Sequence, residues 1–135
     1  MKLLIDANIL LDVLQNRAGF VEDSSLVWKL CETGQAEGFV SVLTFANLVY
    51  VMRKELAPEK IEEVCKQLSL LFHFADFSVS DMNRAAEMKW KDFEDAIQSA
   101  TAERVGAAYL ITRNVKDFSK SKVPALTPAE FLARL

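Results

Sequence analysis

Long apolar runs are missing from the 135-residue sequence. A membrane-spanning helix needs roughly 20 consecutive apolar residues, and no stretch approaches that length. A signal peptide is also unexpected, because Lys2 is followed by only three apolar residues before the charge of Asp6. We therefore expect a cytoplasmic protein without membrane contact.

Cysteine and histidine are scarce. Cys31 and Cys65 fall in helical patterns without metal-ligand spacing, and we interpret them as reduced thiols. His73 is the only histidine, which excludes a zinc site built on a pair of histidines. The glycine-rich phosphate loop of nucleotide-binding ATPases is absent as well.

An excess of positive charge is also lacking. The net charge is −3 and the pI is about 5.2, which argues against a protein that coats nucleic acid through bulk charge. An enzyme that acts on nucleic acid is not excluded, because a cluster of catalytic carboxylates would itself lower the pI.

Short apolar runs alternate with amphipathic segments along the chain. We expect strands at 3–5, 39–42, 72–79, 109–112 and 123–126, and helices at 9–15, 23–33, 43–54, 57–71, 80–89, 92–105 and from 127 onward. Such alternation predicts an α/β fold with a mainly parallel sheet of about five strands. No linker or repeat interrupts the pattern, so we expect a single domain over residues 1–135.

Acidic and amide side chains follow the predicted strands. Asp6 ends the first strand, Asp92, Glu94 and Asp95 open a helix, Asn114 and Asp117 follow the strand at 109–112, and Asn47 lies on the helix after the second strand. In open α/β sheets, ligands bind at the carboxyl ends of the strands. Each acid also has a structural interpretation: Asp6 and Asp92 as helix N-caps, Asp95 in capping-box position and Asp117 as a turn residue.

Considered together, these carboxylates favour a metal site. Three or four of them near one edge of the sheet repel one another unless a cation binds or their pKa values rise. Oxygen ligands of this kind suit Mg²⁺ or Mn²⁺, ions that assist hydrolysis of phosphodiesters.

Three motifs resemble those of the PIN-domain family. They are the opening Leu3-Leu4-Ile5-Asp6-Ala7-Asn8, the pair Asp92-Phe93-Glu94-Asp95-Ala96-Ile97 and Leu110-Ile111-Thr112-Arg113-Asn114-Val115-Lys116-Asp117-Phe118, and the ending Leu126-Thr127-Pro128-Ala129-Glu130-Phe131. The resemblance covers the whole chain.

The resemblance implies a three-layer α/β/α fold and a metal-dependent ribonuclease. Many small members are toxins of VapC-type toxin–antitoxin pairs, so the implied partners are an RNA substrate, a cognate antitoxin and a second copy of the chain. By position, Asp6, Asp95 and Asp117 resemble the catalytic metal ligands for Mg²⁺ or Mn²⁺, with Asp92 beside them. Asn8, Thr112 and Asn114 would be supporting polar residues.

One position departs from the family pattern. Many members have a glutamate on the helix after the second strand, where this chain has Asn47. An amide oxygen can coordinate a metal but brings no charge and cannot act as a base. Asn47 therefore puts a second metal position in doubt and leaves open a catalytically silent fold that binds RNA or protein. A phosphotransfer domain is a remote alternative, since no matching phospho-acceptor ends the third strand.

Basic residues follow the strand at 109–112. Arg113, Lys116, Lys120 and Lys122 could hold an RNA backbone beside the acids, or form an ordinary solvated loop. Lys89 and Lys91 flank Trp90, which could stack on a base or pack between helices. The helix at 43–54 has more apolar residues than a single buried face requires. These residues belong either to the core or to a surface for a partner, and they are Phe45, Leu48, Val49, Val51 and Met52.

Overall fold

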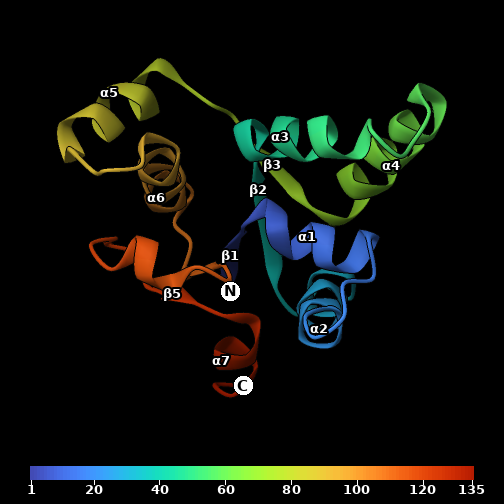
Figure 1. Cartoon of the computed structure of the whole chain (residues 1–135). Helices are drawn as coiled ribbons and strands as arrows, with labels where there is room; N and C mark the ends of the chain where they lie inside the picture. The colour runs from blue at the N-terminus through green and yellow to red at the C-terminus, as the bar shows by residue number, and fades with distance from the viewer.

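The computed structural model describes residues 1–135 as a five-stranded parallel sheet flanked by helices (Figure 1). Its strands are β1 (Lys2–Ile5), β2 (Glu37–Ser41), β3 (His73–Ala75), β4 (Tyr109–Ile111) and β5 (Ala125–Leu126). Its helices are α1 (Ala7–Leu14), α2 (Val21–Glu32), α3 (Val42–Met52), α4 (Pro58–Leu71), α5 (Val79–Met88), α6 (Phe93–Val105), the 3₁₀ helix η1 (Val115–Phe118) and α7 (Pro128–Leu132). None of these helices combines the length and apolar character that a membrane crossing requires.

The N-terminal strand occupies the middle of the sheet. The strand order is β3-β2-β1-β4-β5, so β1 pairs with β2 on one side and with β4 on the other, with Leu3 opposite both Gly38 and Tyr109. All pairs are parallel, which places every carboxyl end at the same edge. The predicted parallel sheet is confirmed, and the residues after β1 and β4 are neighbours.

Burial on both faces explains why β1 is a continuous apolar run. Leu3 and Ile5 belong to the larger core with α1, α2, α4 and α7, whereas Leu4 packs on the opposite face against Ala102 of α6 and Phe118. A strand covered on both faces has no solvent side and therefore shows no alternation of polar residues. The helices form a layer on each face, as the three-layer prediction requires (Figure 1).

Local chemistry moves several boundaries away from those expected. The third strand ends at Ala75 instead of Val79, because Ser78 and not Ser80 caps α5. The Ser78 Oγ accepts the Asp81 N–H at 3.1 Å and an Asp81 carboxylate oxygen accepts the Ser78 N–H at 3.2 Å. A capping box needs an acidic or amide partner placed three residues on, and Asp81 supplies it for Ser78.

Other differences are smaller. Helix α2 begins at Val21 without a side-chain cap, earlier than the expected start at Asp23, and β2 begins at Glu37. The 3₁₀ helix η1 was not expected, and it places Asp117 in a short helical turn after β4. In α3, Leu48 and Met52 are buried in the core while Val51 is exposed, so most of the apolar surplus of that helix is core.

Candidate active site

The carboxyl ends of β1 and β4 hold Asp6 in place. The Asp6 N–H donates to the Ile111 carbonyl oxygen at 2.9 Å, which continues the pairing of the two strands. The buried Thr112 hydroxyl donates to Asp6 Oδ2 at 2.8 Å and accepts the Asn114 N–H at 3.1 Å. This chain of hydrogen bonds fixes one oxygen of Asp6 and links it to the segment that carries Asp117.

Asp6 also caps α1, since its Oδ1 accepts the Asn8 N–H at 3.4 Å. The cap and the site residue are therefore the same side chain. Burial raises the pKa of Asp6 above its usual value, although the hydrogen bonds from Thr112 and Asn8 and the charge of Arg113 act to lower it. Asn8 and Asn114 make these contacts through backbone N–H groups rather than through their amides.

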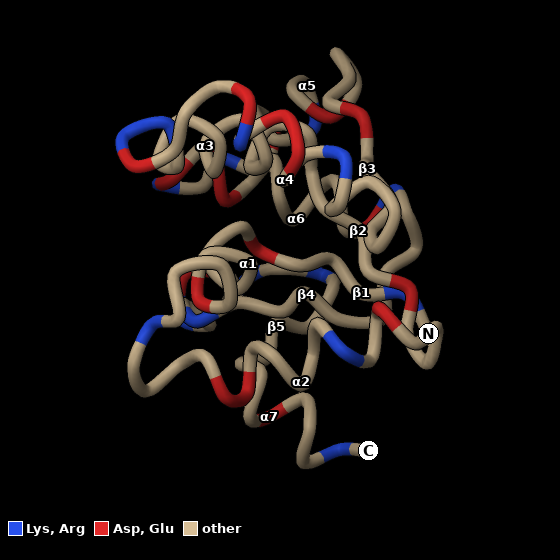
Figure 2. Tube along the Cα trace, turned by 90° about the vertical axis from the view of Figure 1, so that its right-hand side faces the viewer, with Lys and Arg blue, Asp and Glu red and all other residues tan.

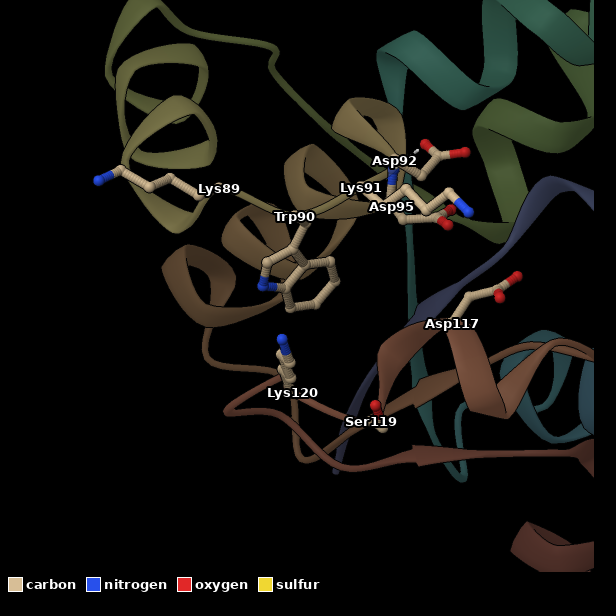
Figure 3. A pocket seen from close by; sticks show the side chains of 8 residues that line it. All are labelled: Lys89, Trp90, Lys91, Asp92, Asp95, Asp117, Ser119 and Lys120. Atoms are coloured by element: carbon tan, nitrogen blue, oxygen red, sulfur yellow. Dashed lines mark hydrogen bonds between the residues drawn. The ribbon is translucent and has the colours of Figure 1, made fainter.

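The start of α6 supplies two more carboxylates. Asp92 is the N-cap, and its Oδ1 accepts the Asp95 N–H at 3.0 Å. The structural interpretation of Asp92 is thus confirmed, and its second oxygen stays free. Figure 3 shows Asp92, Asp95 and Asp117 around a pocket of about 540 Å³.

Asp95 interacts electrostatically with every other acid at this edge. Burial and the neighbouring charges of Asp92, Asp117, Asp6 and Glu94 raise the pKa of Asp95 to about 6. None of these five acids lies within 4.0 Å of a lysine or arginine nitrogen, because every ion pair of the structure lies elsewhere. The structure therefore gathers the predicted acids at one edge with no cation paired to any of them.

The donor set fits a hard divalent cation. No three histidine, cysteine, aspartate or glutamate side chains lie close enough, as they stand, to hold a metal ion. The Asp117 carboxylate makes no hydrogen bond within the protein. Its side chain can therefore rotate toward a metal ion without breaking a hydrogen bond. Uncompensated carboxylates at one edge have the chemistry that Mg²⁺ and Mn²⁺ prefer.

Comparison with known proteins assigns the family. Residues 2–116 match the family model described as a PIN domain. The chain belongs to the PIN-domain family. A comparison with curated proteins finds no match.

Solved structures share the PIN-domain fold of this chain. A toxin–antitoxin complex from Klebsiella pneumoniae is 24% identical, covers 93% of this chain and 96% of its own, and has a TM-score of 0.71. FitAcB from Neisseria gonorrhoeae is 19% identical with coverages of 94% and 98% and a TM-score of 0.72. VapC20 from Mycobacterium tuberculosis, described as a sarcin-ricin loop cleaving toxin, is 10% identical with coverages of 80% and 86% and a TM-score of 0.64.

The glutamate position of the family pattern has a different arrangement in this PIN domain. The Asn47 amide on α3 donates through Nδ2 to Glu94 Oε1 on α6 at 2.6 Å. Asn47 thus faces the acidic edge, and the carboxylate of Glu94 lies beside its amide. Sequence analysis grouped Glu94 with the acids but found no link to Asn47, because the two residues are 47 positions apart and no local pattern connects them.

The predicted cations are divided between different places. Lys120 lines the acidic pocket together with Lys89, Trp90 and Lys91. Lys116 and Arg113 line a second cavity, which shares Asp117 with the acidic pocket. Lys122 lies 4.0 Å from Glu103 and is not part of the pocket.

Arg113 is held by a residue that the sequence analysis did not consider. Its guanidinium lies 3.7 Å from the buried Asp12 carboxylate and 4.3 Å from the centre of the Phe20 ring. Arg17 approaches the same oxygen of Asp12, and the Ser24 hydroxyl donates to the other. A charged residue inside the apolar helix α1 (Ala7–Leu14) was the available signal for this cluster.

Proposed function

We propose that this PIN domain is a divalent-metal-dependent endoribonuclease that hydrolyses RNA phosphodiester bonds. The observation that carries the proposal is the meeting of Asp6, Asp95 and Asp117 at one edge of the sheet, with Asp92 beside them and no cation paired to any of them. These three aspartates would hold Mg²⁺ or Mn²⁺. When bound, the metal supplies Lewis-acid polarisation of the phosphate and lowers the pKa of an attacking water.

The residues of the chain orient and charge the site. Thr112 keeps one Asp6 oxygen in a fixed direction, and the α6 cap at Asp92 sets the direction of the first helical turn, where Asp95 lies. Lys120 and its neighbours in the pocket supply positive charge for the phosphates on either side of the cleaved bond. Positioning of this kind converts a bimolecular encounter into an oriented one.

We further propose that the protein is the toxin of a toxin–antitoxin pair and acts as a homodimer neutralised by a cognate antitoxin. The support is the fold shared with one protein described as a toxin–antitoxin complex and with another described as a toxin. Exposed apolar side chains on α3 and α4, among them Tyr50, Val51 and Leu70, offer surface for such partners.

A catalytically silent module that binds RNA or protein is the second candidate. Asn47 favours it, because this position brings an amide where many family members have a carboxylate. Against it stands Glu94, whose carboxylate lies next to the Asn47 amide.

Cleavage of a pool of single-stranded and structured RNA tests the proposal. The assay compares Mg²⁺, Mn²⁺ and EDTA for the wild type, for Asp95→Asn and for the matched control Asp76→Asn, whose exposed side chain lies outside the acidic pocket. We expect metal-dependent cutting by the wild type and the control, and none by Asp95→Asn. Cutting that survives Asp95→Asn would contradict the assignment of the site, and metal binding without any cutting would favour the silent module.

A further inference from the structure

We propose that the pocket beside the acids is a subsite for one unpaired nucleotide of the RNA, whose base stacks on Trp90 and whose phosphate lies between Lys91 and Lys120. This inference rests on the proposed ribonuclease function and adds a substrate class to it. An RNA cut at this site would present an unpaired nucleotide next to the cleaved bond.

The pocket has the size and the lining for a nucleotide. It measures about 540 Å³ and its eight lining residues include one hydrophobic side chain, Trp90. Small-molecule sites commonly enclose about 300–1,000 Å³. The remaining lining residues are charged or hydroxylic, so the pocket combines one flat apolar ring with polar walls.

The lysines of the pocket have no partner within the protein. No carboxylate oxygen lies within 4.0 Å of the ammonium groups of Lys89, Lys91 or Lys120, whereas Lys60, Lys66 and Lys122 each approach a glutamate. Acidic and basic residues are otherwise mixed along the whole trace (Figure 2). A protein with net charge −3 must therefore bind phosphates through a local group of unpaired cations. The lysines that line this pocket form such a group.

The backbone presents this segment in an unusual way. Lys89 ends α5 with a φ of 57°, in the left-handed region that glycine or asparagine usually occupies. A long cationic side chain at this position costs about 1 kcal/mol more than glycine would. The turn places Lys89, Trp90 and Lys91 in succession at the border of the pocket, where the Lys89 side chain extends away from Trp90 and the Lys91 side chain lies near Asp95 (Figure 3).

Trp90 offers an aromatic surface to the pocket. Its ring packs edge-on against Phe118 with a centroid distance of 6.1 Å and an interplanar angle of 71°, and its indole N–H makes no hydrogen bond within the protein. Figure 3 shows the half-buried ring at the pocket with the Lys120 ammonium directed toward it. A base inside a duplex has both faces covered, so only an unpaired base can stack on such a ring.

Intrinsic fluorescence can isolate this contact. The protein has two tryptophans, and Trp28 packs in the core against Phe72 at 5.3 Å, away from the pocket. The variant Trp28→Phe therefore leaves Trp90 as the only reporter, and Trp90→Phe is the matched control that leaves Trp28. Both are titrated in EDTA, which stops metal-dependent cutting, with a fluorescein-labelled unpaired ribo-oligonucleotide whose anisotropy reports total binding.

We expect Trp90 emission in Trp28→Phe to be quenched with the same Kd that anisotropy gives, and Trp28 emission in Trp90→Phe to stay constant. A duplex of the same sequence should not quench Trp90. The variant Trp90→Leu should weaken binding of the unpaired strand about tenfold. Replacing Lys91 and Lys120 together by alanine should reduce the slope of log Kd against log salt by about 1.4, while Lys122→Ala leaves it unchanged.

The outcomes separate the two proposals. Anisotropy that shows binding while Trp90 emission and the salt slope stay unchanged overturns the subsite, and Mg²⁺-dependent cutting would still uphold the ribonuclease. Quenching with the expected salt slope but no cutting upholds the subsite and overturns the ribonuclease. Absence of both binding and quenching overturns the subsite. Should Trp90→Leu fail to fold, judged by circular dichroism, the quenching of Trp28→Phe decides.

Discussion

At the scale of single residues, Asp95 is the acid whose pKa responds to all the other carboxylates of the site. Its pKa of about 6, against a usual 3.8, results from burial and from four neighbouring carboxylates. A carboxyl with a raised pKa binds its proton more tightly in the folded state than in the unfolded one. The contribution of Asp95 to the free energy of unfolding is therefore fully present below about pH 4, and it is lost as the pH rises through about 6.

Replacing Asp95 by asparagine should therefore stabilise the metal-free protein at neutral and alkaline pH. We expect the free energy of unfolding of Asp95→Asn to exceed that of the wild type by about 1 kcal/mol near pH 8. This value allows for solvent screening of a half-exposed group. The difference should shrink between about pH 6 and pH 4, because the wild type takes up the proton there. Urea denaturation in EDTA across this range measures the difference, with Asp76→Asn as the control.

Asn47 leads to a second prediction at this scale. Asn47→Glu restores the residue common in the family but places a new carboxylate where the amide now donates to Glu94. We expect this variant to lose about 1 kcal/mol of stability in EDTA through like-charge repulsion. Thermal unfolding measures the loss against Ala46→Glu, which adds the same charge at the exposed neighbouring position.

Added Mg²⁺ should remove most of that loss if both carboxylates face the metal. Equal unfolding midpoints for Asn47→Glu and Ala46→Glu in EDTA would falsify the contact between Asn47 and Glu94.

At the scale of elements, α5 and α6 are joined by an ion pair. The Arg104 Nε donates to Asp81 Oδ1 at 2.9 Å, and the buried Asp81 also completes the capping box of Ser78. One carboxylate thus starts α5 and ties it to the last turn of α6. Because α6 carries Asp95, this pair supports the helix on which the acidic site depends.

We expect Asp81→Asn to lower the free energy of unfolding by about 2 kcal/mol at neutral pH, less than for a fully buried pair because Arg104 is partly exposed. Burial alone would raise the pKa of Asp81, but hydrogen bonds from Arg104 and Ser78 lower it below its usual value of 3.8. The stability from this group is therefore present above about pH 4 and is lost below it.

Guanidinium unfolding at several pH values checks this prediction. The deficit of Asp81→Asn should narrow as the pH falls below about 4, where the wild type loses the charge of Asp81. Glu62→Gln, which breaks an exposed pair with Lys66, should cost less than about 0.5 kcal/mol at every pH. A deficit for Asp81→Asn that stays constant down to acid pH would count against the ion pair.

Local signals explain which elements the sequence could predict. The buried run at 3–5 and the proline and capping box at Thr127–Glu130 gave correct elements, because each signal lies within a few residues. The positions of Asp6, Asp92, Asp95 and Asp117 as strand-end, cap and turn residues were predicted for the same reason, and their role as metal ligands stays a prediction.

Contacts between distant residues could not be predicted in this way. The pairing of Asn47 with Glu94 and the attachment of Arg113 to Asp12 depend on the packing of separate elements. The structure places Arg113 against Asp12 and Phe20, and its contact with RNA stays a prediction.

At the scale of the whole molecule, a metal that binds only the folded chain should stabilise it. At a free concentration of about 100 times Kd, one bound ion adds about 2.7 kcal/mol. We expect Mg²⁺ or Mn²⁺ to raise the unfolding temperature of the wild type, with NaCl of equal ionic strength as the control. Differential scanning calorimetry should show no such rise for Asp95→Asn, and an equal rise in both proteins would place the ion elsewhere.

The central position of β1 has a consequence for synthesis on the ribosome. β1 is made long before β4, with which it pairs more than 100 residues later, and Asp117 follows β4. A nascent chain released early lacks both the second neighbour of β1 and the third aspartate. Translation products that stop before Asp117 therefore cannot assemble the acidic edge, and any hydrolytic activity of this protein begins only after that residue has been made.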